Sequence, residues 1–76
     1  KNVSIVEMKI PQSWVGKSLS QLDLRGRYNL NVLGFRAYEN APLDVQFEPN
    51  DLLQADTYIM AVINNQHLDT LAELSE

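Results

Sequence analysis

The position of Arg36 is the first feature that suggests chemistry, because this arginine ends an apolar stretch. Residues 30–36 (LNVLGFR) are apolar on both alternating faces, which predicts a strand in the middle of a sheet. Gly34 precedes Arg36 on the same face, and glycine weakens a strand unless another group must approach closely. This pattern indicates a shallow apolar patch with a permanent cation beside it. The alternative is a packing glycine and a surface arginine paired with Asp44 or Glu39.

Gly16-Lys17-Ser18 resembles the last part of a phosphate-binding P-loop. The full motif needs a glycine five residues before the Gly-Lys pair, and that position is Pro11. The preceding loop has no other glycine, so we predict a turn followed by a helix cap. Ser18 and Gln21 have the spacing of a capping box, in which each residue satisfies a backbone N–H of the other.

The remaining polar candidates indicate neither an enzyme nor a metal site. His67 is the only histidine, and no Ser-His-Asp or Cys-His spacing would orient it as a base. Asp51 and Asp56 lie near a turn, but a calcium loop needs several more oxygen ligands at fixed spacing. Trp14, in a loop bounded by Pro11 and Gly16, either packs over the sheet edge or contacts a partner; we favour packing. The sequence shows no nucleophile or base that a small hydrolase would need.

The composition of the chain excludes further classes of protein and of partner. The 76 residues fit one domain with a small core, since 45% are apolar. Cysteine is absent, so disulfides and thiolate metal sites are excluded. The net charge of −4 and the lack of a basic stripe disfavour a nucleic-acid polymer as partner. No apolar run is long enough for a membrane helix. The chain begins at Lys1 without a leader, and we expect residues 1–76 to be a segment of a longer protein.

The pattern of apolar residues predicts the elements that position these groups. Residues 3–10 and 43–48 alternate as half-buried strands, and residues 57–63 are apolar on both faces like 30–36. A short helix begins after Ser18 and is closed by a left-handed Asn29. Asn64 or Asn65 caps a final helix with one apolar stripe, formed by Leu68, Leu71, Ala72 and Leu74. The order β-α-β-β-β-α predicts an α+β domain of two layers with a mostly antiparallel sheet.

The order and spacing of several segments then resemble one known family over nearly the whole chain. These segments are Ile10-Pro11, residues 16–24 (GKSLSQLDL), residues 27–32 (RYNLNV), Phe35-Arg36, Pro49, Asp56, Leu68 and Leu71. The sequence resembles the TrkA-C (RCK-C) regulatory domain of the TrkA and KtrA gating subunits of potassium transport. Residues 37–48 are longer than the usual family pattern.

The resemblance implies a regulatory domain without enzymatic activity that pairs two-fold. Several members bind cyclic di-AMP at the interface of two such domains, using an arginine and the preceding apolar residue at the end of the central strand. Those residues correspond to Phe35 and Arg36, and a polar-apolar pair on the next strand corresponds to Asp44 and Val45. Two arginines would meet the two phosphates. No other cofactor is implied.

The resemblance also implies a longer parent protein. That parent would carry an N-terminal Rossmann-type domain, would lie in the cytoplasm and would regulate a membrane potassium-transporting subunit without entering the membrane itself. We therefore expect a homodimeric, ligand-sensing regulatory domain. The alternative is a dimerisation or interaction domain of the same complex with no small-molecule ligand of its own.

Overall fold

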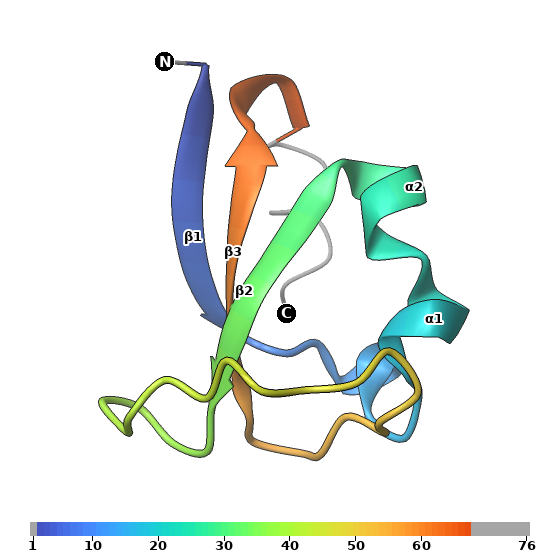
Figure 1. Cartoon of the computed structure of the whole chain (residues 1–76), viewed down its shortest axis with the longest axis vertical. Helices are drawn as coiled ribbons and strands as arrows, with labels where there is room; N and C mark the ends of the chain where they lie inside the picture. The colour runs from blue at the N-terminus through green and yellow to red at the C-terminus, as the bar shows by residue number, and fades with distance from the viewer. Residues whose placement is uncertain (1, 68–76) are drawn as a thin grey trace.

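The computed structural model describes residues 2–67, which form a three-stranded sheet with two short α-helices on one side (Figure 1). In chain order the elements are β1 (Val3–Lys9), the 3-10 helix η1 (Gln12–Trp14), α1 (Leu19–Leu22), α2 (Leu24–Tyr28), β2 (Leu30–Arg36), β3 (Tyr58–Asn64) and the 3-10 helix η2 (Asn65–His67). The predicted α+β architecture with an antiparallel sheet is confirmed. The expected final helix on Leu68 to Leu74 lies outside the described residues.

β3 occupies the middle of the sheet, and both of its neighbours are antiparallel to it, in the order β1-β3-β2. The prediction that residues 57–63 form a central strand is therefore confirmed. The prediction that residues 30–36 also form a central strand is wrong, because β2 lies at an edge of the described sheet. The apolar residues of β2 have another explanation, since Leu30, Val32 and Phe35 pack in the core and Leu33 is 38% exposed.

A β-bulge at Leu33 changes which side chains of β2 share a face. Val32 pairs with Ala61, and Gly34 pairs with Met60, so Leu33 is the extra residue. The side that faces the helices carries Leu30, Val32 and Phe35 of β2 opposite Ile63, Ala61 and Ile59 of β3. Simple alternation along residues 30–36 would place Gly34 on the same face as Leu30 and Val32, and the bulge moves it to the opposite face. Gly34 and Arg36 do share a face, as the spacing predicted.

The opposite side of the sheet, which we call the outer face, points away from α1 and α2. Its residues are Val3, Ile5, Glu7 and Lys9 of β1, Tyr58, Met60 and Val62 of β3, and Asn31, Gly34 and Arg36 of β2. Val3 and Ile5 are 52% and 67% exposed. The alternation predicted for residues 3–10 is correct, with Val6 and Met8 against the core and Glu7 and Lys9 opposite.

The predicted helix after Ser18 exists but is divided in two. The Ser18 hydroxyl accepts from the backbone N–H of Gln21, and the Gln21 side chain accepts from the Ser18 N–H, so the capping box is confirmed. Asp23 then adopts a left-handed conformation (φ 51°) that ends α1, and α2 begins at the next residue. Asn29, also left-handed (φ 55°), closes α2 directly before β2, as predicted.

Residues 37–57 form a long connection that contains no strand, so the strand predicted over residues 43–48 is wrong (Figure 1). Within residues 43–48, only Asp44 exchanges backbone hydrogen bonds with β2, and its two bonds with Phe35 are 2.9 and 2.7 Å long. Pro42 has no N–H to donate, and the Asp44 carboxylate accepts from the backbone N–H of Gln46 instead. These local bonds turn the chain away after one residue pair.

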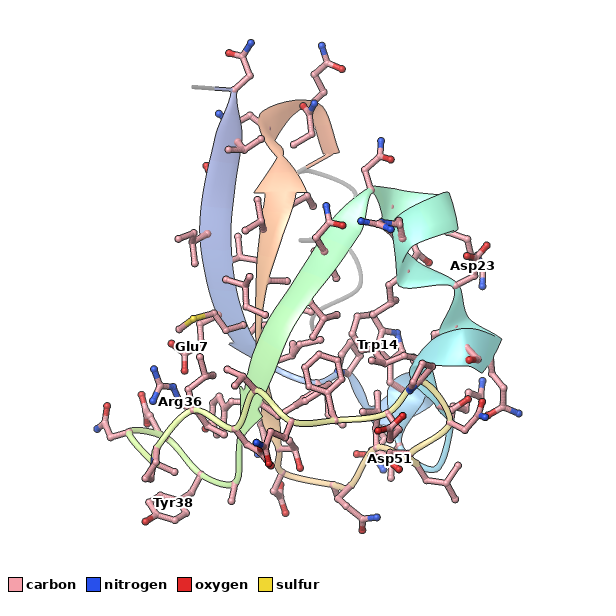
Figure 2. All side chains as sticks on the ribbon, in the orientation of Figure 1. Glu7, Trp14, Asp23, Arg36, Tyr38 and Asp51 are labelled. Atoms are coloured by element: carbon pink, nitrogen blue, oxygen red, sulfur yellow. The ribbon has the colours of Figure 1, made fainter. Side chains whose placement is uncertain are left out.

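The core lies between the sheet and the helices and includes Trp14. Trp14 is 3% exposed and packs in one cluster with the central strand (Figure 2). The buried members of this cluster are Ile10, Trp14, Leu22, Leu24, Leu30, Leu53, Ile59, Ala61 and Ile63. The prediction that Trp14 packs rather than contacts a partner is confirmed.

Candidate functional site

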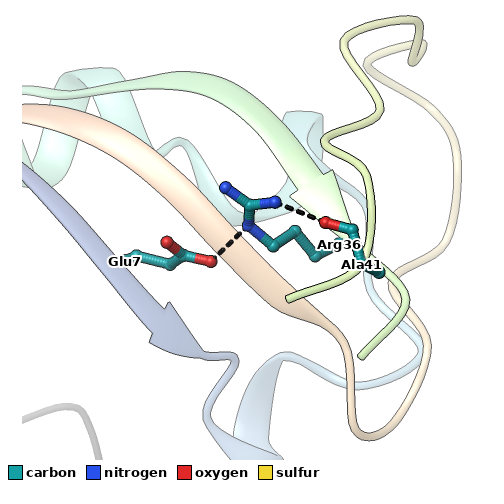
Figure 3. Close-up of polar contacts among 3 residues, drawn as sticks. All are labelled: Glu7, Arg36 and Ala41. Carbon is teal, nitrogen blue, oxygen red and sulfur yellow. Dashed lines mark hydrogen bonds and ion pairs between the residues drawn. The ribbon is translucent and has the colours of Figure 1, made fainter. Parts of the chain in front are cut away.

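Arg36, the last residue of β2, lies on the outer face and reaches across the end of β3 to Glu7 of β1 (Figure 3). Its Nε donates to Glu7 Oε2 at 2.6 Å, and its Nη1 donates to the carbonyl oxygen of Ala41. Glu7 and Arg36 keep 35% and 23% of their side-chain surface exposed. These two bonds use two of the five N–H groups of a guanidinium, so the remaining three can still bind an acceptor.

The partner of Arg36 differs from the ones expected from the sequence. The alternative interpretation paired Arg36 with Asp44 or Glu39, but the ion pair forms with Glu7, which is 29 residues away in the chain. β1 and β2 both pair with β3, and this topology alone brings Glu7 within reach. The alternation of β1 already placed Glu7 on its polar face, and this is the signal in the sequence that could have suggested it.

The backbone of Asp44 crosses directly beside Gly34. A Cβ atom at residue 34 would lie 2.6 Å from the Asp44 carbonyl oxygen and 3.0 Å from Leu43 Cγ. The approach is therefore possible only for glycine at this position, as the sequence pattern indicated. Gly34 thus holds the 37–57 connection against the end of β2, next to Arg36.

The other three predicted site residues lie around the edge of β2. Phe35 faces the core side of the sheet and packs edge-on against Phe47, with ring centroids 5.2 Å apart. Asp44 is bonded to Phe35 through the backbone, and Val45, the next residue, is 63% exposed. The structure therefore brings Phe35, Asp44 and Val45 together at the strand edge, whereas Arg36 points to the outer face. One ligand contacting all four must reach around this edge.

Two grooves lie on the side of the sheet that carries the helices. A groove of about 450 Å³ runs between the helices, the start of β2 and residues 47–49. A smaller groove of about 170 Å³ includes Phe35 and Asp44 among its lining residues, together with Phe47 and Leu52. Phe35 and Asp44 therefore border a concave surface on one side of the sheet, whereas Arg36 lies on the partly apolar outer face.

A second ion pair lies close to Arg36 at the same end of the sheet. Lys9 Nζ and Asp56 Oδ1 are 3.0 Å apart, and both side chains are mostly exposed. The hydrogen bond to Asp56 and the attraction of its charge raise the pKa of Lys9 above its ordinary value of 10.5. The charges at this end of the outer face therefore form two pairs of opposite sign.

The remaining sequence candidates occupy structural positions. The backbone N–H groups of Gly16, Lys17 and Ser18 all donate within the protein, so none is left to hold a phosphate in the manner of a P-loop. Asp51 accepts from the backbone N–H of Glu48 in a turn. His67 lies at the end of η2, and its side chain is outside the described part of the structure. Among residues 2–67, no cluster of histidine, aspartate or glutamate could hold a metal ion.

The sequence pattern of the TrkA-C domain matches residues 3–75. This chain belongs to the TrkA-C domain family. TrkA-C domains are regulatory domains of potassium transport proteins, and the family is not an enzyme family. A search of curated proteins found no match for this sequence. Between residues 2 and 67, this TrkA-C domain has no helix with the length and hydropathy needed to span a bilayer.

Solved structures show the same fold. The RCK C domain of the potassium transport protein KtrA, in complex with cyclic di-AMP, has a TM-score of 0.79 and 22% identity, and the match covers 93% of this chain and 81% of that one. The GsuK RCK domain has a TM-score of 0.80 and 14% identity over 97% of this chain. The GsuK channel bound to NAD has a TM-score of 0.81 and 14% identity over 96%. This TrkA-C domain spans only 16% and 13% of those two GsuK chains.

Proposed function

We propose that this TrkA-C domain senses cyclic di-AMP where two copies of the chain meet, and that Arg36 of each copy binds a phosphate. The observation that carries the proposal is the position of Arg36, a half-buried guanidinium with three uncommitted N–H groups at the rim of an exposed apolar face. The related KtrA domain was solved with this dinucleotide and supports the choice of ligand. A two-fold symmetric ligand with two phosphates matches two copies that each present one cation.

The other site residues serve the adenine bases in this proposal. Val45 offers exposed apolar surface, and Phe35 forms the edge of the smaller groove. Asp44 Oδ1 already accepts from the Gln46 N–H, so the second carboxylate oxygen is the one that would accept from an adenine amine. Asp44 would repel a phosphate, which places the phosphate on the side of Arg36 and the base on the side of Asp44.

Isothermal titration calorimetry with cyclic di-AMP tests this assignment. We expect Arg36→Ala to weaken binding by at least tenfold, since a hydrogen bond to a charged group contributes about 1.5–3 kcal/mol. Glu7→Gln is the matched control, because it removes the competing carboxylate and leaves Arg36 in place. Glu7→Gln should bind as tightly as the unaltered chain or more tightly. Equal affinity of the Arg36→Ala protein would remove Arg36 from the site.

The second candidate is an interaction domain that pairs with a copy of itself and has no ligand of its own. The outer face favours it, because Val3 and Ile5 are large apolar residues of this face that are more than half exposed. In a monomer, the solvent side of an antiparallel sheet is normally polar. A contiguous apolar surface of this kind is typical of a protein contact.

Charge favours a second copy as the occupant of the outer face. The chain carries a net charge of −4, so two copies repel unless they meet through a neutral surface. At this face Lys9 and Arg36 are paired with Asp56 and Glu7, so two positive and two negative charges cancel. The excess negative charge of the chain therefore lies elsewhere.

Sedimentation velocity over a range of concentrations tests the contact. We expect the unaltered chain to self-associate and Ile5→Lys to shift it toward the monomer, with an unchanged melting temperature because Ile5 is exposed. Gln12→Lys, at an exposed position of η1 that belongs neither to the outer face nor to the proposed ligand site, is the control. A thermal-shift measurement with cyclic di-AMP separates the two candidates, since a ligand of the folded state raises the melting temperature by mass action.

We further propose that the chain is one segment of a cytoplasmic gating subunit whose other domain contacts a membrane potassium transporter. The GsuK chains support this view, because a match to nearly all of this chain covers less than a fifth of each. A ligand would then act by binding two arrangements of the dimer with different affinity.

A further inference from the structure

A third concave site lies between η1 and α2, away from the outer face. It has a volume of about 180 Å³ and is lined by Ser13, Trp14, Lys17, Leu22, Arg27 and Tyr28. Trp14 and Leu22 are buried core residues and belong to its walls, whereas Lys17 and Arg27 are exposed. The site therefore combines an apolar base with two cations.

The charge of this pocket is opposite to that of the chain. The sequence has ten acidic residues against six lysines and arginines, yet two of those six line this one site and no carboxylate does. The ion pairs recorded within residues 2–67 join Lys9 to Asp56 and Arg36 to Glu7. Lys17 and Arg27 are therefore not neutralised by a carboxylate partner in the described part of the chain.

The polar groups around the pocket are suited to an acceptor. Lys17 and Arg27 can only donate, and Ser13 and Tyr28 carry hydroxyl groups that can donate. Arg27 lies over the Tyr28 ring, with Cζ 5.8 Å from the ring centroid, and this cation–π contact restricts the guanidinium. An anion entering the pocket would thus meet one guanidinium held against an aromatic ring and a second cation, the exposed ammonium of Lys17.

We propose that this pocket binds a phosphate group through Lys17 and Arg27. A phosphate carries up to two negative charges and several strong acceptor oxygens, so it matches two cations better than a carboxylate does. The site is independent of Arg36, which points to the outer face on the other side of the sheet. The phosphate is either free or carried by a mononucleotide, whose base would lie against the Tyr28 ring.

Trp14 provides the measurement, because it is the only tryptophan of the chain and it lines the pocket. Inorganic phosphate and adenosine monophosphate are titrated separately at constant ionic strength, with sodium chloride as the reference salt, while tryptophan fluorescence is recorded. We expect a saturable change in fluorescence with at least one of the two probes. Tighter binding of the nucleotide identifies a nucleotide as the source, and equal binding identifies free phosphate.

Two conservative variants decide whether the named cations bind the phosphate. Lys17→Gln and Arg27→Gln keep most of each side chain and should each weaken binding about tenfold, the usual effect of losing a hydrogen bond to a charged group. Arg25→Gln, on the same short helix but in the larger groove, should bind normally. If Arg27→Gln does not fold by circular dichroism, the exposed Lys17→Gln variant decides alone.

Two results overturn this proposal. One is a fluorescence change that follows ionic strength and does not saturate with either probe. The other is saturable binding that Lys17→Gln leaves unchanged. Neither result bears on cyclic di-AMP binding at Arg36, and loss of dinucleotide binding in Arg36→Ala would leave the phosphate pocket intact, so the two proposals fail separately.

Discussion

At the scale of the residue, the ion pair of Arg36 is compatible with the binding role that we propose for it. Its contact with Glu7 is partly exposed, and such pairs contribute only about 0–1 kcal/mol to stability. A phosphate can therefore displace or share this interaction at little cost. Gly34, two positions earlier, cannot be replaced as easily, because the backbone of Asp44 leaves no room for a side chain at this position.

Gly34→Ala should destabilise the protein by about 1–3 kcal/mol, as overpacking does in rigid surroundings. The added Cβ would meet the Asp44 carbonyl oxygen at 2.6 Å, and a backbone atom moves away only if the whole connection shifts. Gly26→Ala in α2 is the control, because the three atoms nearest to its added Cβ belong to the exposed Asp23 carboxylate, which can rotate away. Gly26→Ala should raise the free energy of unfolding by up to about 1 kcal/mol, because alanine has the higher helix propensity. Urea unfolding measures the stability of both variants. Equal unfolding midpoints for Gly34→Ala and Gly26→Ala would contradict this account of Gly34.

The Lys9–Asp56 pair should stabilise the fold in a pH-dependent manner. Because the pKa of Lys9 is raised in the folded state, the contribution is complete below pH 10.5 and is lost as the pH rises through the higher folded value. Asp56→Asn removes the acceptor charge and still suits the left-handed backbone at this residue (φ 64°). The difference in melting temperature between the unaltered chain and Asp56→Asn should therefore shrink above pH 10.5. A difference that is constant up to pH 12 would argue against the pair.

At the scale of the element, local sequence signals predicted the helix ends correctly, but they predicted a strand over residues 43–48 that does not form. The capping box and Asn29 depend on bonds between residues three or four apart, so the sequence contains everything needed to predict them. The left-handed Asp23 that divides the helix was not predicted. In residues 43–48 the alternation was that of a strand, but the carboxylate of Asp44 and the ring of Pro42 removed the donors that a ladder needs.

Ser18→Ala should cost about 1 kcal/mol, the usual value for losing an N-terminal cap. Ser18 is 4% exposed, and its hydroxyl accepts from the Gln21 N–H, which would be left without a partner. Ser20→Ala, an exposed position in the same helix, is the matched control and should change stability by less than about 0.5 kcal/mol. Urea denaturation of the two variants compares them directly. Similar losses in both would mean that the capping box contributes nothing measurable.

At the scale of the whole molecule, the sheet separates two apolar surfaces with different roles. The side facing the helices forms the core, and the outer face leaves Val3 and Ile5 exposed. Sequence alternation assigned β1 a polar face, yet only Glu7 and Lys9 at its second half are charged. The first half of β1 is apolar on the outer face, and for this reason we propose that self-association occurs there.

The core side should be intolerant of truncation. Leu30→Ala removes a side chain that is 2% exposed and should cost about 2–5 kcal/mol. A domain of this size has a total stability of only about 5–15 kcal/mol, so a large fraction would be lost. Val45→Ala, at a 63% exposed position, should be nearly neutral. Thermal melts followed by circular dichroism test both variants. A Leu30→Ala protein with the same melting temperature as the unaltered chain would show that this core is misassigned.

The sequence alone determined the family, the α+β class, β1, the capping box and the helix end at Asn29, because each depends on composition, alternation or contacts between near neighbours. It also identified Gly34 and Arg36 as unusual. The tertiary structure decided that β3 rather than β2 is central, that Arg36 bonds to Glu7, and that Lys17 and Arg27 share a pocket. These features depend on strand order and on residues that are distant in the chain, and no local pattern records which strands become neighbours.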